Sequence, residues 1–240
     1  QELFSTSTFE IQKIRIATVT YEGIDRKNIE KDTYYLLIKE DEMILEGDET
    51  KTIEISEDVE DTVRKTLEYK KALKKTKESD LVVLDGTITP RNIDSSLYEK
   101  LTKKPNIVGV AKATTARNTD GLPASYVFSR YTKQEGISKP YVYEALHHDI
   151  TTSFFSTYKN RVFRIDATQN HNVSNLLPHT KDPVMPGYPY GLIDADEQAR
   201  VTNWEVDQER VSIQQRVGFE TFQDLEESGN IHDLLDTKRF

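Results

Sequence analysis

The chain has 240 residues, of which 36% are hydrophobic and 30% charged, with a net charge of -9 and no cysteine. Its length and apolar content support a buried core, as one large α/β domain or two small ones, and the lack of cysteine excludes disulfides and thiolate metal sites. No run of about eighteen apolar residues occurs, so we expect no membrane span, and the lack of cysteine fits a reducing cytoplasm, where we expect the protein.

The first quarter of the chain shows the alternation of apolar and polar residues that is typical of half-buried strands. This pattern covers residues 9–21, 34–40 and 51–56, and a Glu-Gly-Asp turn at 46–48 separates the last two. We therefore expect an N-terminal antiparallel meander.

A helix is expected over residues 57–77, because Val59, Val63 and Leu67 recur four apart. Acidic residues crowd its start and lysines its end, as the helix dipole favours. Its basic face, with Tyr69, could bind the phosphates and bases of a polynucleotide or could simply be solvated.

The middle of the chain predicts a β-helix-β unit. An apolar strand at 81–86 is followed by a helix at 94–103 and a second apolar strand at 106–112. Strands connected in this way lie parallel, so we expect these two to be parallel neighbours.

The remaining segments contain fewer regular patterns. Residues 113–136 show no clear periodicity, 137–150 could form a helix, and 161–167 form a strand. Four prolines mark 169–191 as an ordered loop, after which helix extends from Leu192 into the tail. Since no repeat or low-complexity linker occurs, we expect one domain over residues 1–240.

Asp85 follows four apolar residues and precedes Gly86, which places its carboxylate where the strand leaves the sheet. Ligand sites in open α/β sheets favour that edge. An Asp-Gly pair that only forms a turn explains the same residues equally well.

A second cluster of carboxylates comprises Asp194, Asp196 and Glu197, just after the proline-rich loop. Such a cluster suits a divalent ion, because carboxylate oxygens bind magnesium or manganese. The alternative is the negatively charged first turn of a helix, with Asp194 as its cap.

Three further residues are candidates with ordinary alternatives. Glu68, the lone acid of the basic stretch, could be a ligand or a helical partner of a nearby cation. Lys112 and Arg117 could hold a phosphate or lie in solvent.

Several enzyme classes lack their local signatures. No GxxxxGK[ST], GxGxxG or GxSxG motif occurs, and the five histidines show no HExxH spacing. Nucleoside-triphosphate, dinucleotide and hydrolase-elbow chemistry are therefore disfavoured.

Taken in order, LVVLDGTI, NIVGVAKATTAR, RVFRIDA and GYPYGLIDADEQARV resemble the NurA nuclease family. The resemblance implies an RNase H-like mixed sheet flanked by helices and a metal-dependent deoxyribonuclease that uses Mn²⁺ or Mg²⁺. It implies 5'-3' exonuclease and single-strand endonuclease activity in DNA end resection and double-strand break repair. It also implies a homodimer that binds a HerA-type hexameric ATPase translocase.

The resemblance also assigns roles to residues. It makes Asp85 and Glu68 metal ligands, leaves Asp194 and Asp196 competing for the last ligand position, and gives Lys112 a catalytic role beside the phosphate. The expected DNA contacts are Lys112, Arg117, Tyr188, Tyr190 and Arg164.

One departure from the family pattern leaves alternatives open. The family's first metal ligand lies in an Asp-Gly-Ser motif that ends a strand, and this motif does not occur here. We expect it upstream of Gln1, whereas the alternatives are a noncatalytic DNA- or translocase-binding subunit and a PIWI-like nucleic-acid-binding module.

Overall fold

The structure is a computed structural model in which two compact units can be described, each built from separate stretches of the chain. One unit comprises Gln1–Thr18, Ile29–Val59 and Glu197–Phe240, and the other comprises Val19–Asn28 and Glu60–Asp196. The structure describes residues 2–5, 9–39, 43–46, 52–53, 59–91, 93–112, 117–134, 141–147, 150–158, 161–168, 173–182 and 185–218. The prediction of one domain remains a prediction.

The first unit is built on an antiparallel meander, as the alternating pattern predicted. Its strands pair in sequence order: β1 (Glu2–Ser5), β2 (Phe9–Glu22), β3 (Asp25–Lys39), β4 (Met43–Glu46) and β5 (Thr52–Ile53). The predicted turn at 46–48 lies largely outside the described residues.

Helix α5 (Asn203–Val217) packs on the meander through ion pairs. Lys13 of β2 pairs with Glu209, and Arg15 pairs with Glu205 at 2.6 Å. Thr202 and Glu205 form a capping box that starts the helix. The predicted C-terminal helix is thus confirmed over 203–217, and residues 219–240 lie outside the described part.

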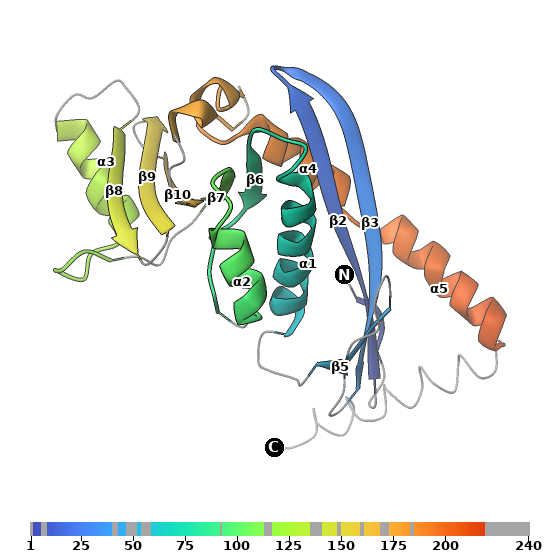
Figure 1. Ribbon diagram of the computed structural model, residues 1–240. Helices are drawn as coiled ribbons and strands as arrows, with labels where there is room; N and C mark the ends of the chain where they lie inside the picture. Colours follow the sequence, from blue (N-terminus) through green and yellow to red (C-terminus); the bar gives the residue numbers. More distant parts are fainter. Residues whose placement is uncertain are drawn as a thin grey trace. The chain divides into compact units, whose positions relative to one another are not determined.

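The second unit contains a mixed five-stranded sheet (Figure 1). Strands β6 (Val82–Asp85) and β7 (Ile107–Ala111) are parallel neighbours, as predicted, with Asp85 opposite Val110. The sheet order is β6-β7-β10-β9-β8, and β10 (Arg161–Thr168), β9 (Ile150–Tyr158) and β8 (Tyr141–His147) add antiparallel pairings. The predicted α/β class with a mixed sheet is confirmed.

Helices α1 (Val59–Lys75) and α2 (Ser95–Thr102) pack on one face of this sheet. Tyr69 and Ala72 of α1 meet Leu101 of α2 and Ile107 of β7 in one buried cluster. Because Tyr69 is buried there, the interpretation that its ring meets nucleic-acid bases is wrong.

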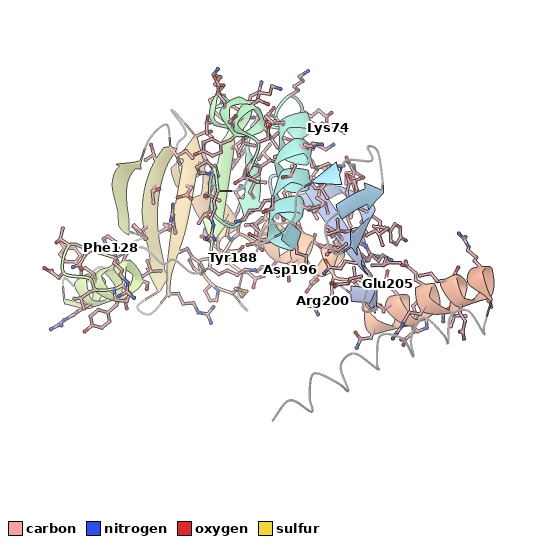
Figure 2. The ribbon with its side chains drawn as sticks, turned by 90° about the horizontal axis from the view of Figure 1, so that it is seen from below. Lys74, Phe128, Tyr188, Asp196, Arg200 and Glu205 are labelled. Carbon is pink, nitrogen blue, oxygen red and sulfur yellow. The ribbon has the colours of Figure 1, made fainter. Side chains whose placement is uncertain are left out.

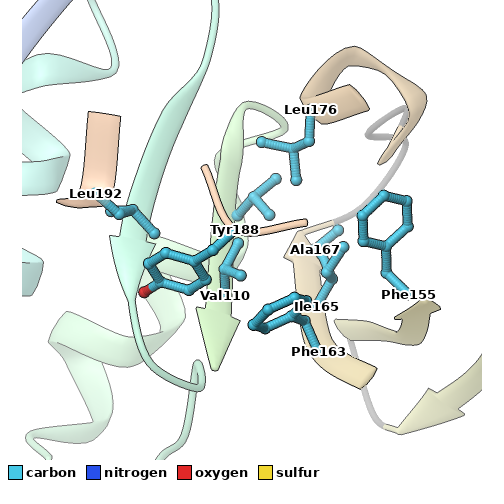
Figure 3. Close-up of a cluster of buried hydrophobic side chains, with 9 residues drawn as sticks. Val110, Phe155, Phe163, Ile165, Ala167, Leu176, Tyr188 and Leu192 are labelled. Carbon is cyan, nitrogen blue, oxygen red and sulfur yellow. The ribbon is translucent and has the colours of Figure 1, made fainter. Parts of the chain in front are cut away.

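The opposite face of the sheet carries a second apolar cluster (Figure 3). Side chains of β7 and β10, among them Val110 and Ile165, pack against Leu176, Tyr188 and Leu192. Leu176 belongs to the 3-10 helix Val173–His179, and Leu192 to α4 (Tyr190–Ala199). The proline-rich segment thus contains a helical turn that covers the sheet.

The described part of residues 137–150 does not form the predicted helix. Tyr141–His147 is strand β8, which pairs antiparallel with β9. In this pairing Tyr141 lies opposite Ser156, and His147 lies opposite Ile150. The stretch YVYEALH is rich in β-formers, and a neighbouring strand supplies backbone partners that override a weak helical pattern.

Helix α3 (Ala124–Gln134) was not predicted, because residues 113–136 show no clear apolar period. Its Phe128 stacks on Phe154 of β9, with ring centroids 4.8 Å apart. This aromatic contact and the buried Ala124 help to hold a helix that also carries the exposed Tyr126 and Tyr131.

Candidate active site

Asp85 lies at the carboxyl end of β6, and its side chain is 39% exposed. Gly86 follows with a φ of 118°, a conformation that favours glycine and turns the chain away from the sheet. The Lys112 ammonium, just past the end of β7, lies 3.1 Å from an Asp85 carboxylate oxygen. The parallel strands thus bring two predicted site residues together.

Tyr188 binds the other oxygen of the same carboxylate. Its hydroxyl donates to Asp85 Oδ1 at 2.5 Å, and Lys112 Nζ lies 5.0 Å from the centre of its ring. Burial, followed by the hydrogen bond to Asp85, raises the pKa of the Tyr188 phenol well above its usual range. Tyr188 therefore stays protonated and holds the carboxylate in one orientation.

Glu68, on α1, interacts electrostatically with Asp85. Its carboxylate pairs with Arg64 at 3.2 Å. The pKa of Glu68 is raised to about 7, chiefly by burial, while Arg64 lowers it and the negative charge of Asp85 raises it. Two carboxylates that repel each other across one site favour a bound cation.

The structure separates the two aspartates of α4. The charge of Asp196 contributes to raising the pKa of Tyr188, the residue that binds Asp85, and Figure 2 labels both Tyr188 and Asp196. Asp194 instead accepts hydrogen bonds from Tyr21 at 2.7 Å and from Arg26 at 3.1 Å. Residues two apart on a helix project in nearly opposite directions, so Asp196 is directed away from the side on which Asp194 binds Tyr21 and Arg26.

Three predicted DNA contacts lie elsewhere. Arg164 pairs with Asp166 at 2.8 Å on the sheet face that α1 and α2 cover, whereas Asp85 projects from the other face. Arg117 donates to the Gly121 carbonyl, and Tyr190 donates to the Gly23 carbonyl at 2.8 Å. The structure does not bring these three side chains to Asp85.

Sequence reasoning missed the residues that hold the segment after Asp85. Asp166 is fully buried and accepts hydrogen bonds from the Ile88 backbone N–H and the Thr152 hydroxyl, in addition to its pairing with Arg164. Tyr69 accepts from the Thr89 N–H at 3.0 Å. The only signal in the sequence was an aspartate between the apolar residues Ile165 and Ala167 of a predicted strand.

A close backbone approach fixes the same segment against β7. A Cβ atom added to Gly109 would lie 2.5 Å from the Gly86 carbonyl oxygen, so only glycine fits there. The segment after Asp85 is therefore held by Gly109, Asp166 and Tyr69 at once.

The donor chemistry of the site suits a hard divalent cation. Glu68, Asp85 and Asp196 supply carboxylate oxygens, which Mg²⁺ and Mn²⁺ prefer, and Glu68 and Asp85 repel each other. As the described side chains lie, no three carboxylates or histidines are positioned to hold one ion. Asp85 instead binds Lys112 and Tyr188. The three carboxylates therefore supply the oxygen donors that a divalent cation prefers, but their side chains are not oriented to bind one ion together.

A NurA domain matches residues 10–201 of the chain. The chain belongs to the NurA family of nucleases. The match includes every residue of the Asp85 site, from Glu68 to Asp196. The resemblance inferred from the sequence motifs is thereby confirmed.

Solved structures similar to this NurA chain include endonuclease V of Ciona intestinalis, in complex with a 24mer DNA containing an inosine followed by a ribo-adenosine. It is 14% identical, with a TM-score of 0.39, over 79% of this chain and 85% of that chain. Human ENDOV is 13% identical, with a TM-score of 0.42, over 83% and 86%. Likeness at this level adds nothing to the family assignment, and a comparison with curated proteins finds no match.

No helix among the described residues of this NurA chain is long and apolar enough to cross a membrane.

Proposed function

We propose that this chain is a metal-dependent deoxyribonuclease that hydrolyses DNA phosphodiester bonds at the Asp85 site. One observation carries the proposal: Asp85, at the end of a parallel strand, is oriented by Tyr188 and Lys112 and repels Glu68 electrostatically. Family membership supports phosphodiester hydrolysis, and the carboxylate donors support a hard cation.

The residues of the site have three different roles in this proposal. Asp85, Glu68 and Asp196 would hold Mn²⁺ or Mg²⁺, which supplies an activated water and offsets charge on the leaving oxygen. Lys112 would pair with the phosphate and offset its negative charge. Tyr188, kept protonated, holds the Asp85 carboxylate in place.

The finer biological role rests on the family resemblance. We assign the chain 5'-3' exonuclease and single-strand endonuclease activity in DNA end resection and double-strand break repair. We also propose that the chain forms a homodimer, binds a HerA-type hexameric translocase and acts in the cytoplasm.

A noncatalytic subunit that binds DNA or a translocase is the second candidate. It is favoured by one observation, namely that no Asp-Gly-Ser sequence occurs in the 240 residues. Such a subunit would bind DNA without producing cleavage fragments.

Cleavage of end-labelled single-stranded and duplex DNA separates the two candidates. The purified chain should cleave the DNA in the presence of Mn²⁺ or Mg²⁺, and EDTA should stop the cleavage. The Glu68→Gln variant should cleave it much more slowly. Asp207→Asn, which alters an exposed aspartate of α5, is the matched control and should cut normally. A gel shift without products under every metal condition would support the noncatalytic subunit instead.

A further inference from the structure

The tip of the β2–β3 hairpin presents a single apolar side chain to solvent. Its two-residue turn consists of Gly23, with a φ of 61°, and Ile24. Ile24 is 81% exposed, the highest value among the large hydrophobic residues that the structure describes. Charged residues flank it, including Glu22 and Lys27, which pair at 3.2 Å.

Hydrogen bonds anchor this turn to the start of α4. Tyr190 donates to the Gly23 carbonyl at 2.8 Å, and its ring meets the Tyr21 ring edge-on at 4.9 Å. Asp194 accepts from the Tyr21 hydroxyl at 2.7 Å and from Arg26 at 3.1 Å through both oxygens. A charge-assisted contact to both carboxylate oxygens fixes orientation as well as distance.

The helix that anchors the turn also belongs to the Asp85 site. Tyr188, which holds Asp85, lies two residues before Tyr190, which holds Gly23. Asp196, whose charge contributes to raising the pKa of Tyr188, lies two residues after Asp194. Residues at and just before the start of one helix therefore hold the exposed Ile24 in a fixed position relative to the Asp85 site.

We propose that Ile24 is a wedge that unstacks the end of a DNA duplex and delivers one strand to the Asp85 site. This inference rests on the proposed nuclease function. Proteins that open or kink DNA insert apolar side chains between base steps, where the side chain replaces lost stacking contacts. A wedge must keep its position against the stacked bases, and the contacts of Tyr190 and Asp194 supply that support.

A protein partner fits the tip less well. Specific protein interfaces bury on the order of 800 Å² per partner, and one isoleucine between charged neighbours offers a small fraction of that area. The charged pair Glu22–Lys27 would also have to be desolvated against a protein surface. The end of a base stack needs only one apolar contact.

Fluorescence of 2-aminopurine placed at the terminal pair of a blunt duplex tests the wedge without any cleavage. In EDTA, the wild-type chain should raise the fluorescence as the base unstacks, and Ile24→Ser should raise it several-fold less at saturating protein. Ile24→Leu should behave as wild type. Leu122→Ser removes another exposed apolar side chain, 45% exposed, and should also behave as wild type. Equal fluorescence with Ile24→Ser and wild type overturns the proposal.

Cleavage rates then distinguish failure of the wedge from failure of the nuclease assignment. Ile24→Ser should cut blunt duplex about tenfold more slowly, with cutting of single-stranded oligonucleotide unchanged. If wild type cuts both substrates and Ile24→Ser matches it on both, the wedge fails and the nuclease stands. An equal loss on both substrates also overturns the wedge, because it indicates a contact needed by every substrate. If wild type cuts neither, the nuclease assignment fails and the fluorescence result alone decides the wedge.

Discussion

Tyr188 and Asp85, 103 residues apart in the chain, are joined by a 2.5 Å hydrogen bond from phenol to carboxylate. This bond connects the segment before α4 to the end of β6, so the two parts of the proposed site hold each other. Lys112 completes the arrangement by contacting the Asp85 carboxylate and the face of the Tyr188 ring.

Tyr188→Phe should slow cleavage while the fold persists. It removes one hydrogen bond to a charged group, worth roughly 1.5–3 kcal/mol, which corresponds to about a 10- to 100-fold loss if the bond persists in the transition state. Single-turnover rates on single-stranded DNA measure this. Tyr126→Phe, on the exposed side of α3, should cut at the wild-type rate; an equal loss in both variants would refute a specific role for Tyr188.

Glu68 should make stability depend on pH when no divalent ion is present. Its folded pKa of about 7 lies above its ordinary value of 4.5, so the folded state binds more protons than the unfolded state between these values. Stability should therefore fall as pH rises from about 4.5 through 7, by on the order of 3 kcal/mol in total.

Urea unfolding at pH 5 and pH 8 measures this effect. Glu68→Gln cannot titrate, so it should lose most of the difference between the two pH values that wild type shows. If the variant keeps the full wild-type difference, the dependence arises from other groups.

Asp166→Ala should destabilise the second unit strongly. It leaves the Arg164 guanidinium, the Ile88 N–H and the Thr152 hydroxyl without their shared partner, and breaking a buried ion pair costs about 3–5 kcal/mol. Chemical denaturation measures the loss. Asp207→Ala, on the exposed side of α5, should change stability by less than about 0.5 kcal/mol; an equally small change for Asp166→Ala would contradict the structure.

Gly109→Ala should damage both stability and activity. The added Cβ would lie 2.5 Å from the Gly86 carbonyl oxygen, so the backbone after Asp85 must move, at a cost of about 1–3 kcal/mol. Gly191→Ala is the matched control, because Gly191 lies in helix α4 and the added Cβ would make an ordinary van der Waals contact with the Tyr21 ring. Melting temperatures and cleavage rates should drop for Gly109→Ala alone, and a drop confined to Gly191→Ala would reverse the prediction.

Local pattern was enough to predict the parts of the site that lie on one β-helix-β unit. The apolar runs that end at Asp85 and Lys112, joined by a helix, predict parallel strands with adjacent carboxyl ends, and the structure places these side chains 3.1 Å apart. The four-residue spacing in α1 likewise placed Glu68 on the helix before the strand.

Contacts distant in sequence could not be predicted in this way. The choice between Asp194 and Asp196 depends on which side of α4 meets Tyr21 and Arg26, and those residues come from a hairpin more than 160 positions earlier. Strand β8 depends on pairing with β9, and Asp166 has partners on three different segments. Such features depend on tertiary contacts, which cannot be predicted from a local sequence pattern.

The rate of cleavage by Asp85→Asn tests the central claim most directly. The substitution keeps the size of the side chain and removes the charge that would bind the cation. At saturating Mn²⁺, single-turnover cleavage of end-labelled single-stranded DNA should fall by at least roughly a hundredfold, the loss typical of removing an electrostatic contact to the transition state. The melting temperature should remain close to that of wild type. A wild-type rate in a folded Asp85→Asn chain would contradict the assignment of the site.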